Sequence, residues 1–267
     1  MVIDKMGRTI LKGRWKSAVA AQTLQLLATA AGSALGVGAF AVFGDRGLSL
    51  AAATVLTLDI LAVSPLKWGI ASFYWQSIYR PETAFGTCLR TAYRSHYRKA
   101  VAWRIQLRLR QMGWFAVCML PWVLGCVALT RFETLTATPW TAAATVFLRA
   151  VTAFCIPAGV AAYAVCMLAY LPALYLMIAG ADTGEAFAWS RKLMKGSYNQ
   201  TAWYFGGFVW WLPLGVAAFV PISALFESGK AGLAYRRLRD FRRKTGASDA
   251  DKKRSVSGVP IPNDACT

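Results

Sequence analysis

Long runs of apolar residues alternate along this chain with segments that hold most of its Lys and Arg residues. The runs at residues 18–43, 48–78 and 112–130 approach or exceed the ~20 residues that a helix needs to cross a bilayer. Further apolar runs cover residues 140–180 and 201–226. The pattern predicts an all-α protein, a polytopic bundle of transmembrane helices.

The composition supports this class of protein. The chain has 267 residues, of which 57% are hydrophobic and 16% charged, with a mean hydropathy of +0.41. This leaves too little polar surface for a soluble domain. The net charge of +18 could indicate a nucleic-acid partner. However, the Lys and Arg residues flank the apolar runs, as in the cytoplasmic loops of membrane proteins, so we expect no nucleic acid.

The basic segments predict the topology. Residues 1–17, 80–111 and 230–254 are rich in Lys and Arg, and such segments stay on the cytoplasmic side. We therefore expect a multi-pass protein of the cytoplasmic membrane with both termini in the cytoplasm and an even number of spans. A cleaved signal peptide is the alternative for the N-terminus, but the apolar run at 18–43 exceeds the ~7–15 residues of such peptides.

A short pattern recurs three times before apolar runs: a basic residue, a small residue, any residue, an aromatic residue and then polar residues leading to Ala. It occupies residues 12–18, 94–100 and 195–202, with Trp15, Tyr97 and Tyr198 as the aromatic residues. Aromatic rings in this setting lie at the membrane interface. We therefore predict that the three rings are interfacial anchors on one side, the cytoplasmic side.

The recurring pattern predicts how many times the remaining apolar runs cross the membrane. If residues 195–202 are cytoplasmic, the run at 140–180 crosses once, with a span near 153–180 and a break near Pro157. An even number then requires two more spans, near 200–218 and 219–238. Residues 1–240 would form six spans, arranged as three helical hairpins, with amphipathic helices on the cytoplasmic side. The polar, basic and Pro-containing residues 241–267 predict a disordered cytoplasmic tail.

Residues 182–196 read Asp-Thr-Gly-Glu-Ala-Phe-Ala-Trp-Ser-Arg-Lys-Leu-Met-Lys-Gly, and a Trp-rich run and Val220-Pro221 follow. Here the chain resembles the bacterial integral membrane family called domain of unknown function nine-seven-five. The matching positions are Asp182, Ser190, Arg191, Lys192, Met194, Lys195 and Gly196. Two departures are Pro157-Ala-Gly159, where the family has Pro-Gly, and the segment after Pro221. The family has no established activity, so the resemblance implies an architecture and no function.

Asp59 is the residue with the clearest candidate chemistry, because it lies near the middle of the second apolar run. A charged carboxylate at that depth costs about 2.5–3.5 kcal/mol on insertion scales. One interpretation is an ion or proton site, helped by a helix break at Pro65 that frees backbone carbonyls. The other is a hydrogen-bonded contact between helices. Lys67, beyond Pro65, is expected to extend its ammonium toward the headgroups.

Other chemistry finds little support in the sequence. His96 is the only histidine, and no two cysteines form a C-x-x-C pair, so we predict no metal site, no cofactor and no enzymatic activity. The small residues Gly32 and Gly36 permit close helix packing, either within the bundle or between subunits. A homo-oligomer or a hetero-oligomer therefore stays open.

The segment 183–197 is amphipathic when placed on a helix. Its apolar face is expected to hold Ala186, Trp189, Leu193 and Met194, with Arg191, Lys192 and Lys195 elsewhere. Such a helix suits the surface of a leaflet that contains anionic lipids. We therefore expect a non-enzymatic membrane accessory or scaffold protein whose partner is the anionic lipid of the inner leaflet. The alternative is a transporter or channel that uses Asp59.

Overall fold

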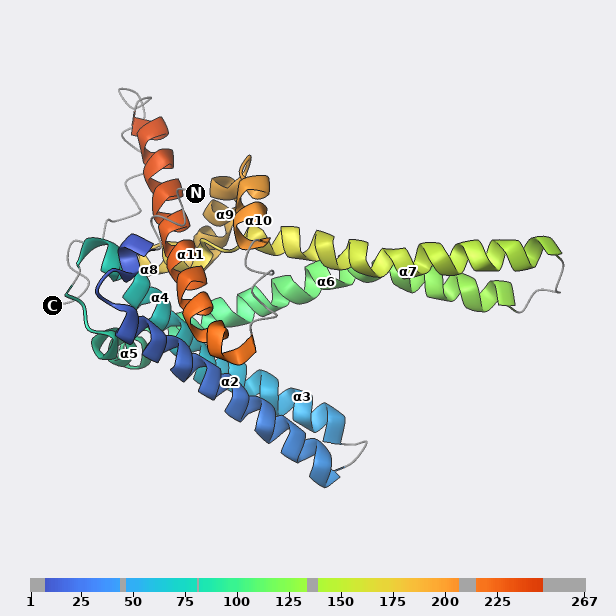
Figure 1. Ribbon diagram of the computed structural model, residues 1–267, viewed down its shortest axis with the longest axis horizontal. Helices are drawn as coiled ribbons and strands as arrows, with labels where there is room; N and C mark the ends of the chain where they lie inside the picture. Colours follow the sequence, from blue (N-terminus) through green and yellow to red (C-terminus); the bar gives the residue numbers. More distant parts are fainter. Residues whose placement is uncertain (1–7, 44–46, 81, 134–138, 207–214, 247–267) are drawn as a thin grey trace. The chain divides into compact units, whose positions relative to one another are not determined.

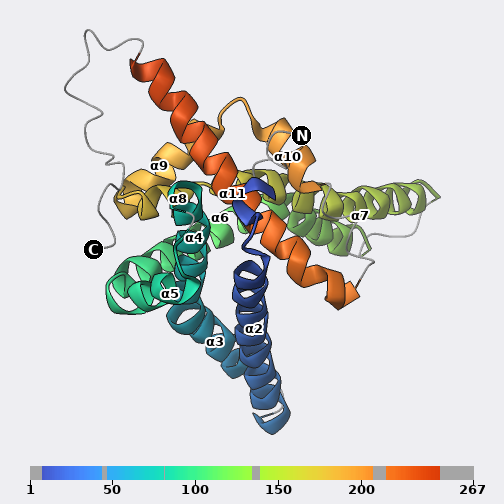
Figure 2. The same cartoon turned by 60° about the vertical axis from the view of Figure 1, so that its left-hand side comes forward.

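The computed structural model describes residues 8–43, 47–80, 82–133, 139–206 and 215–246, and within these residues all regular structure is helical (Figures 1 and 2). This confirms the all-α prediction. The elements are α2 (Trp15–Phe43), α3 (Gly47–Leu58), the π-helical segment η2 (Asp59–Val63), α4 (Ser64–Tyr79), α5 (Phe85–Arg94), α6 (Tyr97–Glu133), α7 (Pro139–Leu168), α8 (Ala173–Ile178), α9 (Thr183–Met194), α10 (Tyr198–Gly206) and α11 (Gly215–Gly246).

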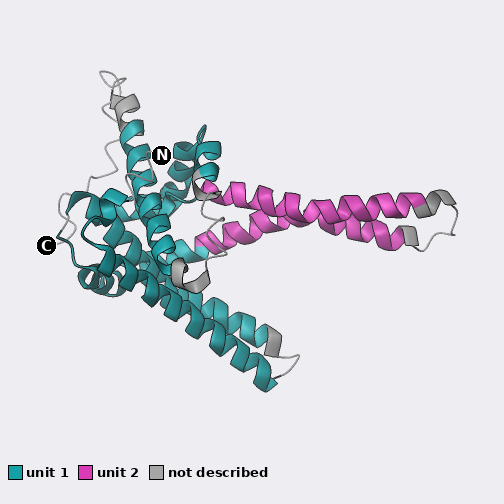
Figure 3. Ribbon diagram, in the orientation of Figure 1, with its two compact units in different colours: residues 1–105, 170–267 teal, residues 106–169 magenta. Residues whose placement is uncertain are grey.

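Four helical stretches are long and apolar enough to cross a membrane, judged by length and composition over the described residues. They are Trp15–Phe43, Ser49–Tyr79, Tyr97–Arg131 and Ala143–Ile178. The chain divides into two compact units, residues 1–105 with 170–267 and residues 106–169, coloured separately in Figure 3. Helices of this length and hydropathy indicate a membrane protein.

The core of the first unit is built around α4. Of its 16 residues, 11 are buried, including Phe73, Tyr74 and Trp75. Phe73 packs against Phe85 of α5, and Trp75 packs against Tyr175 of α8, with ring centroids 5.8 and 5.9 Å apart. Other helices thus surround α4 on several sides, so its apolar surface is covered by protein.

The close approach of α5 to α4 depends on Gly69. A Cβ atom at this position would lie 3.1 Å from the Cα atom of Leu89 and 3.5 Å from the Cβ atom of Ala92. Such distances are at or below ordinary contact, so a larger residue would push the two helices apart. The absence of a side chain at Gly69 therefore sets the spacing of this helix pair.

The first turns of α2 belong to the same core. Arg14, just before the helix, donates from Nη1 to Ser77 Oγ at 2.6 Å, and Gln22 Nε2 donates to the Tyr74 hydroxyl at 3.4 Å. Beyond these turns the helix is largely exposed, and Val42 near its end keeps 76% of its surface. Helix α3 packs alongside, where Gly36 faces Val55. Gly36 therefore serves packing within the chain, as one of the two open interpretations expected.

The second unit pairs the distal part of α6 with α7 (Figure 3). Gly125 faces the side chain of Thr152, and Gly159 faces the backbone carbonyl of Cys118. Phe115 and Tyr163 meet edge to face at 5.8 Å. Small residues therefore let the two backbones approach closely, as is common where helices pack in lipid.

Three expected boundaries differ from the structure. Helix α6 begins at Tyr97 and not near residue 112, because Arg, Gln and Leu are good helix formers and the charges of residues 98–110 mark polar surroundings without ending the helix. Helix α7 continues through Pro157, since a transmembrane helix tolerates the loss of one hydrogen bond. The chain turns instead at residues 169–172, after the end of α7. Helix α7 also begins earlier than the expected span 153–180, at Pro139.

The C-terminal boundaries also differ. Helix α11 runs without interruption across the expected boundary between spans 200–218 and 219–238, and continues to Gly246, into the expected tail. Pro221 does not end it. Residues 207–214, which include the Trp-rich run at 208–211, and residues 247–267 of the tail lie outside the described residues.

Gly159→Ala tests the α6–α7 packing. A Cβ atom at Gly159 would lie 2.7 Å from the Cys118 carbonyl oxygen, and backbone cannot rotate away, so we expect a loss of about 1–3 kcal/mol in stability. Gly113→Ala is the matched control, because nothing lies within 4 Å of its Cβ position and Ala favours a helix by about 1 kcal/mol over Gly. Thermal unfolding in detergent should separate the two variants, and equal midpoints would contradict the packing.

Candidate functional site

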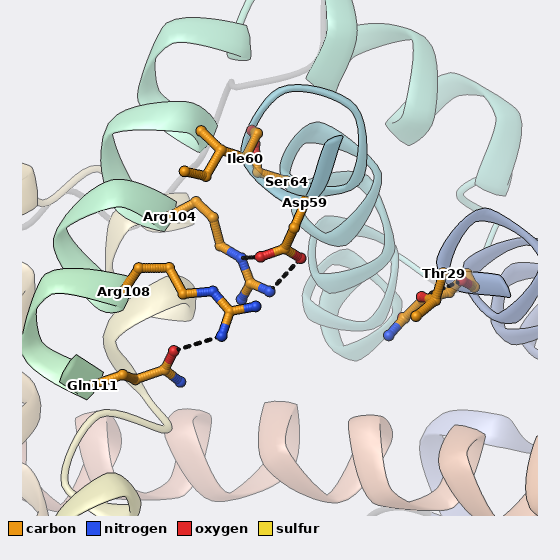
Figure 4. Close-up of polar contacts among 8 residues, drawn as sticks. Thr29, Asp59, Ile60, Ser64, Arg104, Arg108 and Gln111 are labelled. Carbon is orange, nitrogen blue, oxygen red and sulfur yellow. Dashed lines mark hydrogen bonds and ion pairs between the residues drawn. The ribbon is translucent and has the colours of Figure 1, made fainter. Parts of the chain in front are cut away.

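Asp59 forms an ion pair with Arg104 of α6 (Figure 4). Arg104 donates from Nε to Oδ2 at 2.9 Å and from Nη2 to Oδ1 at 2.6 Å. The two side chains are 7% and 16% exposed, Arg104 being the more buried. This bidentate geometry is the strongest form of a carboxylate–guanidinium contact. The structure thus supplies a charged partner for the carboxylate within the first unit.

The backbone around Asp59 is π-helical, and Asp59 is the first residue of that segment. Two of its carbonyls accept hydrogen bonds from side chains: Ser64 Oγ donates to Ile60 O at 2.5 Å, and the Tyr93 hydroxyl donates to Ala62 O at 2.8 Å. Pro65, which lacks an N–H, stands at the start of α4. The expected break at Pro65 is thus a local π-helical widening, and these two carbonyls already have donors.

Arg104 was not foreseen from the sequence. It lies in the basic segment 80–111, and the positive-inside rule interprets the charges of such a segment as evidence of a cytoplasmic loop. A usable signal was present, because a carboxylate inside a membrane usually pairs with another charged group. Arg104 also stands between the apolar residues Trp103 and Ile105, which is unusual for a cation exposed to water.

A second ion pair lies in α11. Lys230 Nζ donates to Glu227 Oε1 at 2.6 Å, with the side chains 18% and 21% exposed. The Tyr175 hydroxyl donates to the backbone carbonyl of Glu227 at 3.2 Å. Both pairs act electrostatically on Lys67 of α4, which is half-buried. Lys67 thus lies beside a cluster of charges in the first unit, and its extension toward the headgroups stays a prediction.

The three predicted anchors occupy equivalent places. Trp15, Tyr97 and Tyr198 are the first residues of α2, α6 and α10. Three residues later stand Ala18, Ala100 and Thr201, each 0% exposed. The amide of each of these donates to the carbonyl of the residue just before the aromatic, at 3.0, 2.9 and 3.1 Å. The recurrence is therefore a shared helix start, with Thr201 and not Ala202 matching the two alanines.

Two of the three copies share a further detail before the helix start. Gly13 and Gly196 have φ angles of +77° and +81°, a left-handed conformation that favours glycine. In the middle copy Ser95 takes this place with φ −103°.

His96, which follows Ser95, stacks on Trp68 with ring centroids 5.8 Å apart. Burial and the nearby Lys99 lower the pKa of His96 below its usual value, which favours the neutral ring.

The segment that resembles the family forms α9. Asp182 precedes its first turn, and Ser190 and Met194 are fully buried, whereas Arg191, Lys192 and Lys195 are exposed. The buried face differs from the expected one: Phe187 and Ser190 join Ala186, Leu193 and Met194, while Trp189 is half-buried under the Lys192 ammonium, 5.1 Å from its ring centroid. Ring packing of Phe187 on Tyr170, at 5.6 Å, shows that protein covers this face.

The described residues contain no group of three or more His, Cys, Asp or Glu side chains that could hold a metal ion. The fold and the buried ion pairs thus define an all-helical protein with apolar helices of membrane length and charged groups packed inside its first unit. No family model, curated protein or solved structure matches this chain. The resemblance carried by residues 182–196 therefore stays a prediction.

A double-mutant cycle tests the Asp59–Arg104 contact. Asp59→Asn or Arg104→Gln alone leaves a buried charge without its partner, so each should lower the free energy of unfolding by about 3–5 kcal/mol. The double variant should lose less than the sum of the two. The measurement is unfolding in mixed micelles by increasing amounts of a denaturing detergent.

The matched control for this cycle is Asp240→Asn. Asp240 pairs with Arg236 at 3.9 Å, and the two side chains are 43% and 48% exposed, so solvent screening limits the loss to about 1 kcal/mol or less. Strict additivity of the Asp59 and Arg104 variants would show that the two residues do not stabilise each other.

Proposed function

We propose that this chain is a six-span, non-enzymatic protein of the bacterial cytoplasmic membrane that serves as an accessory or scaffold. It belongs, in this proposal, with the family that residues 182–196 resemble. Its cytoplasmic surface is basic and binds anionic lipids of the inner leaflet. The observation that carries the proposal is α9, whose apolar face is buried while Arg191, Lys192 and Lys195 are exposed.

The lengths of the helices support a placement of the first unit's core beyond the cytoplasmic ends of the spans. Helix α2 has 29 residues and α6 has 37, about 44 and 56 Å at ~1.5 Å per residue, against ~30 Å of hydrocarbon. The first turns of α2 are buried in the core of the first unit, and its later turns are exposed and apolar. The excess length of α2 therefore lies in the core.

The shared helix starts support three hairpins of one orientation. In this arrangement α2 pairs with α3–α4, α6 with α7, and α10 with α11. Each outgoing helix begins with the basic and aromatic pattern, at Trp15, Tyr97 and Tyr198. A shared helix start in all three copies is expected if all three face the same headgroups, since the cation and the ring both favour that layer.

The alternative function, a transporter or channel that uses Asp59, has less support. The carboxylate accepts two hydrogen bonds from Arg104, and the carbonyls of Ile60 and Ala62 have side-chain donors. These groups already serve packing. An ion flux in proteoliposomes that disappears with Asp59→Asn, while the folded yield is unchanged, would favour the alternative.

Cysteine labelling tests the topology. In a background without native cysteines, Lys195→Cys should resist a membrane-impermeant maleimide in intact cells and react after permeabilisation, because the proposal places α9 in the cytoplasm. Ser49→Cys, in the first turn of α3, should react in intact cells, because the proposal places the start of α3 on the outer side. Both positions are exposed, so burial does not hide either thiol. Labelling of Lys195→Cys in intact cells would exclude the three-hairpin topology.

Lipid enrichment tests the basic surface. We expect the triple variant Arg191→Gln, Lys192→Gln, Lys195→Gln to retain less phosphatidylglycerol, relative to neutral lipid, after purification in mild detergent. Each cation near an anionic surface contributes about 1 kcal/mol, and the difference should shrink in high salt. The control is Arg131→Gln, an exposed cation at the far end of α6. Equal enrichment in the triple variant and the control would exclude this role of α9.

A further inference from the structure

Helix α5 packs against α4 in the opposite direction, and this brings the turn after α5 close to η2. Near the start of α5, Phe85 packs on Phe73 with ring centroids 5.8 Å apart. Near its end, the Tyr93 hydroxyl donates to the Ala62 carbonyl at 2.8 Å. The numbers rise along α5 while they fall along α4 and η2, so the turn between α5 and α6 lies beside η2 and the first turns of α4.

This turn and the helix ends next to it, residues 93–99, form a basic and aromatic surface that we call the α5–α6 corner. Arg94, Arg98 and Lys99 are exposed, and no hydrogen bond or ion pair joins their side chains to another residue in the described part of the chain. Tyr93 and Tyr97 keep 43% and 36% of their surface exposed. The corner thus offers unpaired cations and exposed rings to a partner.

The exposed apolar surface of the neighbouring helices ends beside this corner. Along α3 and η2 the last exposed large aliphatic residue is Leu61, at 46%, and the first residues of α4 are buried. Along α6 the first such residue is Ile105, at 41%. The ion pair between Asp59 and Arg104 joins the two helices at this level. The exposed apolar surface therefore begins at one common level on both helices, next to the ion pair.

With this apolar surface in the hydrocarbon, the corner lies at the depth of the lipid headgroups. Lys99 and Arg98 precede Ile105 on α6 by about 9–10 Å along the helix axis. The headgroup layer extends about 5–8 Å beyond the hydrocarbon, and long basic side chains reach across the difference. Exposed Tyr rings favour the same layer. A soluble acidic partner would match the charges, but it would leave the rings and the adjoining apolar surface unexplained.

We propose that the α5–α6 corner is a docking surface for the headgroups of anionic phospholipids, separate from the basic surface of α9. Arg offers directed N–H groups to phosphate oxygens, and Lys offers a point charge. The proposal rests on the proposed function, which places these helix ends at the inner leaflet. It adds a second contact with lipid and puts the Asp59–Arg104 pair at the edge of the hydrocarbon.

The test measures which lipid lies beside the corner in the full-length protein. Ser95→Cys, at an exposed position of the corner, is labelled with a fluorophore in a background without native cysteines. The protein is placed in phosphatidylcholine nanodiscs that contain a minor fraction of brominated phosphatidylglycerol, or the same fraction of brominated phosphatidylcholine. Bromine quenches only fluorophores close to it. We expect several-fold stronger quenching by the brominated phosphatidylglycerol, and a smaller difference in high salt.

Two double variants test the cations: Arg94→Gln with Arg98→Gln, and Arg98→Gln with Lys99→Gln. Each cation at an anionic surface favours anionic lipid about fivefold, so either variant should lose most of the preference. Arg94→Lys with Arg98→Lys should keep it. The matched control, Arg191→Gln with Lys192→Gln, removes two exposed cations of α9 and should leave the quenching at the label unchanged. The thermal midpoint, measured on every variant, should not change, because the replaced side chains are exposed and unpaired.

Three results would overturn the proposal. The first is no quenching by either lipid, as for a surface that faces solvent or a soluble acidic partner. The second is equal quenching by both lipids, and the third is a preference that survives in both double variants. Failure of the proposed function gives a different result: Lys195→Cys would react in intact cells, or the α9 triple variant would keep its lipid enrichment, while the preference at Ser95→Cys persists.

Discussion

A carboxylate inside an apolar helix stays charged only if another element brings a cation to it. Asp59 meets this condition through Arg104, which approaches with two hydrogen bonds from the second turn of α6. Coulombic attraction is strong where water is scarce, but removing both ions from water costs several kcal/mol each. The geometry of the pair must therefore be kept, and it fixes the start of α6 against the helix that carries Asp59.

The π-helical segment that begins at Asp59 also needs hydrogen-bond partners from other parts of the chain. A π-helical turn frees backbone carbonyls from the regular hydrogen-bond ladder, and these need other donors when water is absent. Ser64 and Tyr93 supply them to Ile60 and Ala62. Tyr93 belongs to α5, so the irregular backbone also ties α5 to the helix that carries the carboxylate. The π-helical segment Asp59–Val63 is therefore bonded to α5 through Ala62 and to α6 through Asp59.

Much of the fold was predictable, because apolar runs of bilayer length leave the backbone few alternatives to helix. The recurring pattern at Trp15, Tyr97 and Tyr198 was visible in the sequence, but it was interpreted as interfacial anchors, and the helix that starts at Tyr97 was expected near residue 112. Arg104 was not, since a charge near a span reads as a marker of the cytoplasmic side. The continuity of α7 through Pro157 was not either, because one missing N–H does not decide whether a helix breaks.

Composition does not show whether an apolar residue is surrounded by lipid or by other residues of the protein. Helices α3 and α4 read as one apolar run, yet α3 is mostly exposed whereas α4 is mostly buried by α5, α8 and other helices. The reason is that lipid and protein interior favour the same side chains, so only tertiary packing distinguishes them. The aromatic rings of α4 are a partial signal, since Phe73, Tyr74 and Trp75 in sequence give it apolar surface on several sides.

The same ambiguity decides how α9 can meet a membrane. An amphipathic sequence predicts a polar and an apolar face, but not whether lipid or protein covers the apolar one. Here Phe187, Leu193 and Met194 are buried in protein, so insertion of this face between acyl chains would require the core to open. In the proposed function α9 contacts lipid through its exposed cations, which act at a distance and are screened by salt. A helix attached in this way senses the charge of a leaflet, whereas an inserted helix would sense its packing and curvature.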